Sequence, residues 1–258
     1  MGGFMNVVAI IQARMSSSRL PGKVLMPLAG RPVLEHVVNR VKACSTISEV
    51  VVATSTDESD DAISAWGQQA GIPVYRGSLQ DVLDRYYQAA KLYKADAVVR
   101  ITADCPALDP SIVDEVVSGF LAGNYDLYGL AGEFPDGLDC TVFAFSALER
   151  AWKEAKLDSE REHVGPYIEN HPELFRNGAL HKFKGLGHHR WTLDEPRDYA
   201  FLQEIFGRLY QEGRQFSSVE VLELLDREPE LLGINNTIIR NEGYLKSVMA
   251  ERSRDVQH

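Results

Sequence analysis

The sequence has few cysteines, no long apolar run and no excess of positive charge, and each absence excludes a class of protein. Its three cysteines, Cys44, Cys105 and Cys140, are far apart and outside any Cys-x-x-Cys pair. This argues against structural zinc and favours a reduced, cytoplasmic protein with buried thiols. No stretch is apolar for long enough to span a bilayer, and no secretory signal is predicted at the N-terminus. The formal net charge of -10 disfavours nucleic acid as a partner, because phosphate binding requires a basic surface.

Internal repeats and low-complexity linkers are also missing from the 258 residues. Apolar residues make up 45% of the chain and charged residues 25%, the balance of an ordinary globular protein with a sizeable core. The sequence becomes polar beyond Asn235. We predict one domain over residues 1–249 and a flexible tail over residues 250–258.

Strand and helix patterns alternate through the first half of the chain. Apolar runs predict strands over residues 7–11, 49–54, 74–75 and 96–102. Helical spacing and capping signals predict helices over residues 32–44, from the turn at residues 55–57 to residue 70, after the RGS turn at residues 76–78, and from residue 109. Such alternation requires parallel strands joined by right-handed crossovers. We therefore predict an α/β fold built on a doubly wound, mostly parallel sheet.

The pattern becomes less regular after Gly123. Strands are predicted over residues 125–130, 138–145, 180–184 and 190–193. Helices are predicted over residues 147–155 and 160–170, from Pro196, and over residues 217–225. We expect this half to contact a second, small ligand.

A polar loop follows the first strand and concentrates positive charge in an acidic chain. Arg14, Arg19 and Lys23 stand in it together with three serines. Hydroxyl and backbone N–H groups bind phosphate oxygens, and the cations offset their charge. The loop is not a Walker P-loop, because Ser17 and Val24 replace the required Gly and Ser or Thr, and it lacks the glycines of a dinucleotide fingerprint. The alternative is a solvated basic loop, but we favour a polyphosphate site.

Two carboxylates are candidate metal ligands at the same edge of the sheet. Asp104 follows the strand at residues 96–102, and Asp194 follows the one at residues 190–193. Ligands of such sheets bind beyond the carboxyl ends of the strands, and Mg²⁺ takes one or two carboxylates plus substrate phosphates. A turn carboxylate at Asp104 and a helix cap at Asp194 explain the spacing equally well.

Longer stretches resemble one family in the right order along most of the chain. They are IIQARMSSSRLPGKVLMPLAGRPVLEHVVNRV, RGSLQDVLDRYYQAAK, VRITADCPALDP, FPDGLDCTVFAFSALERA, EREHVGPYIENHPELFR, RWTLDEPRDYAFL and NEGYLKS. Together they resemble the cytidylyltransferase superfamily that activates sialic acid and 3-deoxy-manno-octulosonate, and within it the spore-coat polysaccharide biosynthesis branch. The resemblance implies a Rossmann-like nucleotidyltransferase fold.

The resemblance also implies roles for individual residues. The phosphates of CTP would be bound by Arg14, Ser18, Arg19 and Lys23, of which Arg14, Arg19 and Lys23 would act in catalysis. Ala13 would also belong to the nucleotide-binding residues. Arg76, Gly77, Ser78 and Asp81 would lie near the base and ribose, and Asp139 and Arg190 would face the acceptor. Asp104 and Asp194 would bind Mg²⁺.

The implied reaction transfers CMP from CTP to a sugar acid or a related hydroxyl or phosphate acceptor, releasing pyrophosphate, in surface-polysaccharide biosynthesis. A homodimer through residues 125–145 is implied as well. One alternative is a glycosyltransferase of similar fold that uses a nucleotide-sugar and a metal-binding DxD motif. The nearest matches, within residues 57–61, are typical of a helix N-terminus instead. The other alternative is a protein that binds a nucleotide without catalysis.

Overall fold

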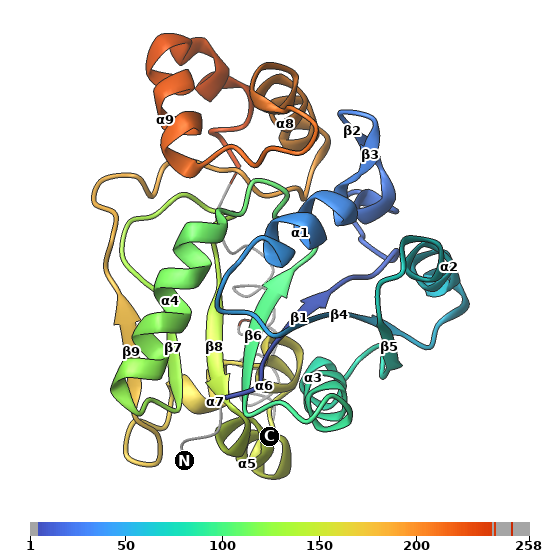
Figure 1. Ribbon diagram of the computed structural model, residues 1–258, viewed down its shortest axis with the longest axis vertical. Helices are drawn as coiled ribbons and strands as arrows, with labels where there is room; N and C mark the ends of the chain where they lie inside the picture. Colours follow the sequence, from blue (N-terminus) through green and yellow to red (C-terminus); the bar gives the residue numbers. More distant parts are fainter. Residues whose placement is uncertain (1–4, 239, 241–248, 250–258) are drawn as a thin grey trace.

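A seven-stranded sheet organises the computed structural model, which describes residues 5–238, 240 and 249. The strand order is β5-β4-β1-β6-β8-β7-β9, and helices cover both faces (Figure 1). The strands are β1 (Val7–Gln12), β4 (Glu49–Ser55), β5 (Val74–Gly77), β6 (Ala97–Thr102), β7 (Leu127–Leu130), β8 (Thr141–Ala144) and β9 (Asn177–Leu180). The predicted doubly wound, mostly parallel sheet is confirmed; the tail predicted at residues 250–258 lies outside the described residues.

Strand β1 lies in the middle of the parallel part and pairs with β4 on one side and β6 on the other. Its side chains alternate between two cores: Ala9 and Ile11 belong to one, and Val8 and Ile10 to the other. A strand covered on both faces needs apolar residues at every position. This explains why the opening run is uniformly apolar.

The helices divide between the two faces of the sheet. Helices α1 (Val33–Lys42), α2 (Asp61–Ala70) and α4 (Pro110–Gly123) bury their apolar sides in the core that contains Ile11. Helices α3 (Val82–Leu92), α5 (Phe145–Glu154) and α7 (Pro166–Glu169) bury theirs in the core that contains Ile10. Short α6 (Asp158–His163) packs against α3 and α7. No helix among the described residues is long and apolar enough to cross a membrane.

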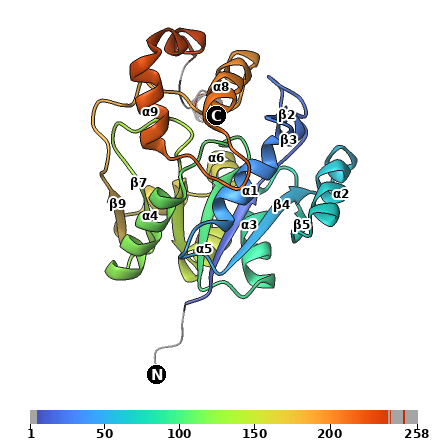
Figure 2. The ribbon, with the colours of Figure 1, turned by 45° about the horizontal axis from the view of Figure 1, so that its top comes forward.

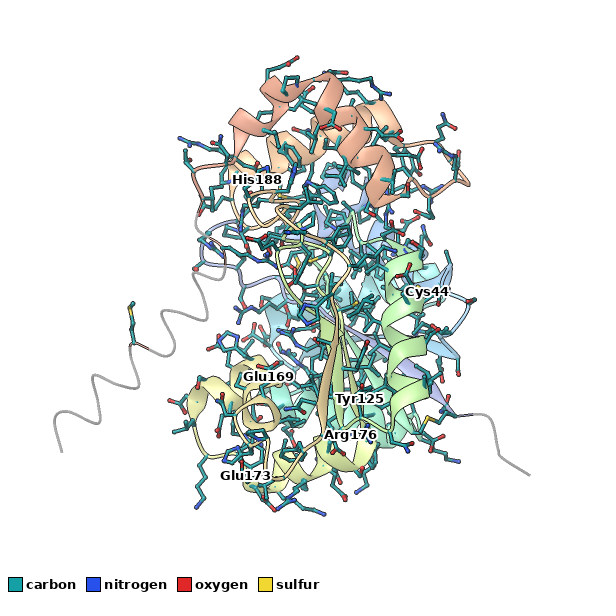
Figure 3. The ribbon with its side chains drawn as sticks, turned by 90° about the vertical axis from the view of Figure 1, so that its left-hand side faces the viewer. Cys44, Tyr125, Glu169, Glu173, Arg176 and His188 are labelled. Atoms are coloured by element: carbon teal, nitrogen blue, oxygen red, sulfur yellow. The ribbon has the colours of Figure 1, made fainter. Side chains whose placement is uncertain are left out.

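Two further helices, α8 (Pro196–Leu209) and α9 (Ser218–Arg227), lie together at one end of the molecule (Figure 2). The buried guanidinium of Arg40 on α1 joins them to the first core, donating to the carbonyls of Leu108 and Phe216 and lying over the Phe216 ring. Figure 3 shows His188 near this end, whereas Tyr125 and Arg176 lie toward the other end. The second half of the chain therefore spans the length of the sheet.

Three predicted elements differ from the observed ones. Residues 190–193 form no ladder, because Trp191 N and Leu193 N donate to loop carbonyls, those of Asp136 and Asp104. The helix predicted over residues 160–170 is divided into α6 and α7, because Val164 has φ 71° and Pro166 starts a new helix. The edge strand predicted over residues 180–184 lies earlier in the chain, at Asn177–Leu180, and residues 181–184 form no strand.

Candidate active site

A cavity of about 330 Å³ lies beyond the carboxyl ends of β1 and β6. Four segments that are far apart in the sequence line it: the loop after β1, the turn after β6, helix α6 and the turn before α8. It brings together most of the residues predicted to bind phosphate and metal. They are Arg14, Ser18, Arg19, Lys23, Asp104 and Asp194.

The loop after β1 is held by its own backbone and by Asp60. Gly22 N and Ser17 N both donate to the carbonyl of Met15 at 2.9 Å. Met15 N donates to the fully buried carboxylate of Asp60 at 2.7 Å. Gly22 has φ 74°, a left-handed conformation that suits glycine. This turn places Lys23 at the start of a short 3-10 helix, η1 (Lys23–Leu25).

The acidic stretch at residues 57–61 forms a helix start, as predicted. Asp57 caps the 3-10 helix η2 (Glu58–Asp60) by accepting from Ser59 N at 2.9 Å. Besides Met15, Asp60 accepts from the backbone N and the hydroxyl of Ser55. Asp60, which lies in both near matches to a DxD motif, is thus engaged in holding the loop after β1.

Lys23 lies between the two candidate metal ligands. Its Nζ donates to Asp104 Oδ2 at 2.7 Å, to Asp194 Oδ1 at 2.8 Å and to the carbonyl of Leu193 at 2.7 Å. Burial lowers the pKa of Lys23, but attraction to the two aspartates outweighs it and the pKa is raised. Burial also disfavours the charged form of Asp104 and so raises its pKa. The Lys23 ammonium outweighs this effect and holds the pKa of Asp104 at about 2. Lys23 and Asp104 are therefore both charged at neutral pH.

Arg190 holds the Asp194 side of the cavity in place. Its guanidinium donates to Asp194 Oδ2 and to both oxygens of Asp198, each at about 3 Å, and to Asp136 Oδ2 at 2.7 Å. Burial lowers the pKa of Arg190. The hydrogen bonds and charges of the aspartates, Asp198 first, outweigh burial and raise the pKa above its ordinary value. Asp198 is fully buried and also accepts from the backbone N of Asp194. The guanidinium predicted to face the acceptor thus orients a candidate metal ligand.

Arg19 and Arg14 place two more cations at the cavity. Arg19 pairs with Asp194 at 3.0 Å and with Glu195 at 3.6 Å. Arg14 is exposed and lines both the first cavity and its neighbour. Three cations from one loop and two carboxylates thus line one cavity, so the cavity can bind an anion and a divalent cation together.

The carboxylate pair suits a hard divalent cation. Among the described residues, no three or more His, Cys, Asp or Glu side chains form a metal cluster. The protein itself would supply the two carboxylates of Asp104 and Asp194, which converge on one ammonium nitrogen. Mg²⁺ is commonly bound in this way, with phosphate oxygens and water completing its shell. The residues present therefore fit a magnesium ion that arrives with a polyphosphate.

A second cavity of about 570 Å³ adjoins the first. The N-terminus of α3 forms one wall, where Asp81 accepts from Asp84 N at 2.9 Å and from Arg161 Nε at 2.7 Å. The Ser78 hydroxyl in turn accepts from Asp81 N at 3.0 Å. Of the residues predicted near the base and ribose, Asp81 lines this cavity and Ser78 supports it.

Arg76 and Gly77 lie at the end of β5, next to the turn that leads into α3. The Arg76 guanidinium donates to the carbonyls of Ser55 and Asp57 and to Asp61 Oδ1 at 2.6 Å. It therefore ties β5 to the start of α2. A Cβ on Gly77 would lie 2.9 Å from the Tyr75 ring and 3.2 Å from Cγ of the buried Arg85, so a side chain would crowd this turn.

Asp139 lies apart from the residues that line the first cavity. Its Oδ2 accepts from Gly137 N at 3.0 Å, and its Oδ1 pairs with Arg240 at 3.4 Å. Gly137 has φ 103°, and a Cβ there would lie 2.7 Å from the backbone carbon of Trp191. Asp139 therefore fixes the turn against which residues 190–194 pack.

Sequence reasoning named no role for several residues that shape the site. Glu162 lines both cavities, Asp60 anchors the loop after β1, and Asp198 holds Arg190 and Asp194. Asp198 follows Pro196 in the first turn of a helix, a signal typical of capping. Glu162 stands in EREHVGPYIENHPELFR, which contributed to the resemblance without a role for any of its side chains.

Comparisons with known proteins agree with this geometry. Residues 8–226 match the model of the cytidylyltransferase family. The chain is 33% identical over 239 residues to the spore coat polysaccharide biosynthesis protein SpsF of Bacillus subtilis, covering 87% of this chain and 96% of that protein. It is 38% identical over 248 residues to uncharacterized protein MJ1063 of Methanocaldococcus jannaschii, covering 93% and 98%. A cytidylyltransferase structure from Leptospira borgpetersenii aligns with a TM-score of 0.85 and 33% identity over 92% of this chain and 100% of that one.

Proposed function

The chain belongs to the cytidylyltransferase family, as the resemblance predicted, and we propose that it transfers CMP from CTP to a small acceptor with release of pyrophosphate. The observation that supports this best is Lys23, whose ammonium lies between Asp104 and Asp194 beside a loop with two arginines. A triphosphate and a divalent ion are the ligands that this arrangement of charges suits.

In the proposed reaction, an acceptor oxygen attacks the α-phosphorus of CTP. The bond from the α-phosphorus to the bridging oxygen breaks, and pyrophosphate leaves with that oxygen. Such catalysis rests on positioning and on stabilising the charge that develops on the leaving group. Lys23, Arg14 and Arg19 supply that stabilisation, and Ser18 binds the phosphates with them. Ala13, whose N–H donates to the carbonyl of Ala53, stays a proposed contact of the nucleotide.

A magnesium ion would be held by Asp104 and Asp194, and it would supply charge neutralisation at the phosphates. Arg190 keeps Asp194 turned toward Lys23, since it binds the other oxygen of that carboxylate. Lys23 keeps the two carboxylates together. The protein thus pre-orients both groups before nucleotide binding.

We propose a sugar acid, or a related hydroxyl or phosphate compound, as the acceptor in surface-polysaccharide biosynthesis. The likeness to SpsF, a spore coat polysaccharide biosynthesis protein by name, supports this choice. We further propose that Asp139 and Arg190 contact the acceptor. We also propose a cytoplasmic location and a homodimer through residues 125–145. Within the described part of that segment, β8 lies inside the sheet with a neighbour on each side, so a dimer would use its loops.

The test is pyrophosphate release from CTP by the purified protein with Mg²⁺ and a panel of sugar acids and phosphorylated acceptors. We expect release that depends on CTP, acceptor and metal, with little release from UTP, ATP or GTP. Release of a free nucleoside diphosphate from a nucleotide-sugar would indicate the glycosyltransferase instead. Binding of CTP without turnover over a broad acceptor panel would indicate a non-catalytic nucleotide-binding protein.

A further inference from the structure

Two described side chains line both cavities of the site: Arg14 and Glu162. The first cavity holds the cationic loop and the aspartate pair, so it suits the triphosphate. The second has Leu79 and Val82 in its wall beside the α3 N-terminus, so it suits a flat base. A residue shared by the two cavities lies where the sugar of a nucleotide must pass between them.

The two shared side chains have opposite charges and therefore different partners. The Arg14 guanidinium attracts phosphate oxygens, whereas the Glu162 carboxylate repels them. An ionised carboxylate accepts hydrogen bonds and donates none, so the hydroxyl groups of a bound nucleotide, and not its phosphates, can be its partners. The 2′ and 3′ hydroxyls of ribose offer such a pair at the junction.

We propose that Glu162 accepts hydrogen bonds from the ribose hydroxyls of CTP and thereby selects ribonucleotides over deoxyribonucleotides. This inference rests on the proposed function, since it assigns a ligand group within the same site. The Glu162 side chain is 44% exposed, and its Oε2 lies 3.8 Å from Nε2 of His163. An ionised carboxylate has about four lone pairs, so it can accept hydrogen bonds from a ligand in addition to its protein partners.

The backbone that carries Glu162 is fixed on both sides. Before it, Arg161 binds Asp81 across the second cavity and donates to the carbonyls of Trp152 and Ala155. After it, Val164 is fully buried with φ 71° and ψ -52°, in a γ-turn closed by Gly165 N and the carbonyl of His163 at 2.8 Å. This conformation is strained for a β-branched residue and persists only where the surroundings impose it. The strain and the Arg161 contacts together hold Glu162 at the junction.

The experiment compares CTP, 2′-deoxy-CTP and 3′-deoxy-CTP as substrates for the wild type, Glu162→Gln and Glu162→Ala. Glu223→Gln, an exposed change on α9, is the control. The wild type and the control should prefer CTP. Loss of the carboxylate should lower kcat/KM for CTP about 10- to 100-fold, the scale of a hydrogen bond to a charged group, and leave the deoxynucleotides almost unchanged.

An unchanged ratio of CTP to deoxy-CTP in Glu162→Ala would overturn the inference. So would a rise confined to the KM of the acceptor, because it would place Glu162 at the acceptor instead. Calorimetric titration of the same nucleotides separates this inference from the proposed function. If the wild type binds CTP in preference to the two deoxynucleotides and Glu162→Ala does not, Glu162 recognises the ribose hydroxyls even if no transfer is found. Equal or absent binding of both nucleotides by the wild type would overturn the inference.

Discussion

The ammonium of Lys23 donates a hydrogen bond to Oδ1 of Asp194 at 2.8 Å, although the two residues are 171 positions apart. The same nitrogen bonds Asp104 and the carbonyl of Leu193. One side chain thus joins the loop after β1, the turn after β6 and the approach to α8. The site is complete only when both halves of the chain have folded.

Replacing Lys23 by alanine should lower turnover by about 10²-fold or more, the scale of a lost transition-state contact. The ammonium also holds Asp104 and Asp194 together, so the loss should fall on kcat rather than only on the KM for CTP. Pyrophosphate release at saturating substrates measures it. Lys42→Ala, an exposed change at the end of α1, is the control; a change in KM alone would make Lys23 a binding residue.

Asp104→Asn should abolish metal-dependent transfer, because the amide keeps the shape of the side chain but loses the charge that a hard cation requires. The circular dichroism spectrum should remain that of the wild type. Pyrophosphate release is measured against Mg²⁺ concentration, with the exposed Asp226→Asn as the control. Full activity at ordinary Mg²⁺ concentrations would refute the metal role of Asp104.

The low pKa of Asp104 also predicts how stability depends on pH. Its pKa is about 2 in the folded protein and about 3.9 in an unfolded chain. The ionised carboxylate therefore contributes about 2 kcal/mol above pH 4, and this contribution is lost as the pH falls from 4 to 2. Urea unfolding of the wild type and Asp104→Asn should differ by about that amount at pH 7, and the difference should close toward pH 2. A difference that is constant over this range would contradict the assigned pKa.

Arg190→Lys should destabilise the protein and slow the reaction. A lysine ammonium cannot reproduce the planar fork that binds Asp136, Asp194 and Asp198 at once. Because Asp198 is fully buried, we expect the free energy of unfolding to fall by about 3 kcal/mol. If Arg190 acts by orienting Asp194, kcat should fall at least about 10-fold with the acceptor KM unchanged. A rise in the acceptor KM would support the direct acceptor contact that the sequence predicted.

Gly137→Ala should lower the free energy of unfolding by about 2 kcal/mol or more, because the new Cβ would meet the backbone of Trp191 and Thr192 and φ 103° is strained for alanine. The same clash should displace Asp194 and reduce activity. Gly207→Ala is a matched control inside α8, where a Cβ meets nothing within 4 Å. That change should be neutral or stabilising by up to about 1 kcal/mol. Equal effects of the two changes in urea unfolding would contradict the prediction.

The parallel half of the sheet was predictable because its signals are local. The run at residues 7–11 is apolar at every position, as a strand buried on both faces requires. Asp109 followed by Pro110 marked the start of α4, where Asp109 accepts from Ser111 N. The same reasoning wrongly predicted a strand over residues 190–193. The sequence pattern of an extended segment is the same whether its N–H groups donate to a neighbouring strand or, as here, to loop carbonyls.

The sequence by itself determined the alternating strands and helices, the basic loop after β1 and the family, because propensity, periodicity and motif order are written in neighbouring residues. Only the tertiary structure decided that Lys23 lies between Asp104 and Asp194, that Arg190 is bound by three aspartates, and that Glu162 lies at the junction of two cavities. The contacts of Lys23 join segments more than 80 residues apart, and Arg190 meets Asp136 across 54 positions. Charge balance among buried groups is a property of the way these segments pack, and the order of residues along the chain does not contain it.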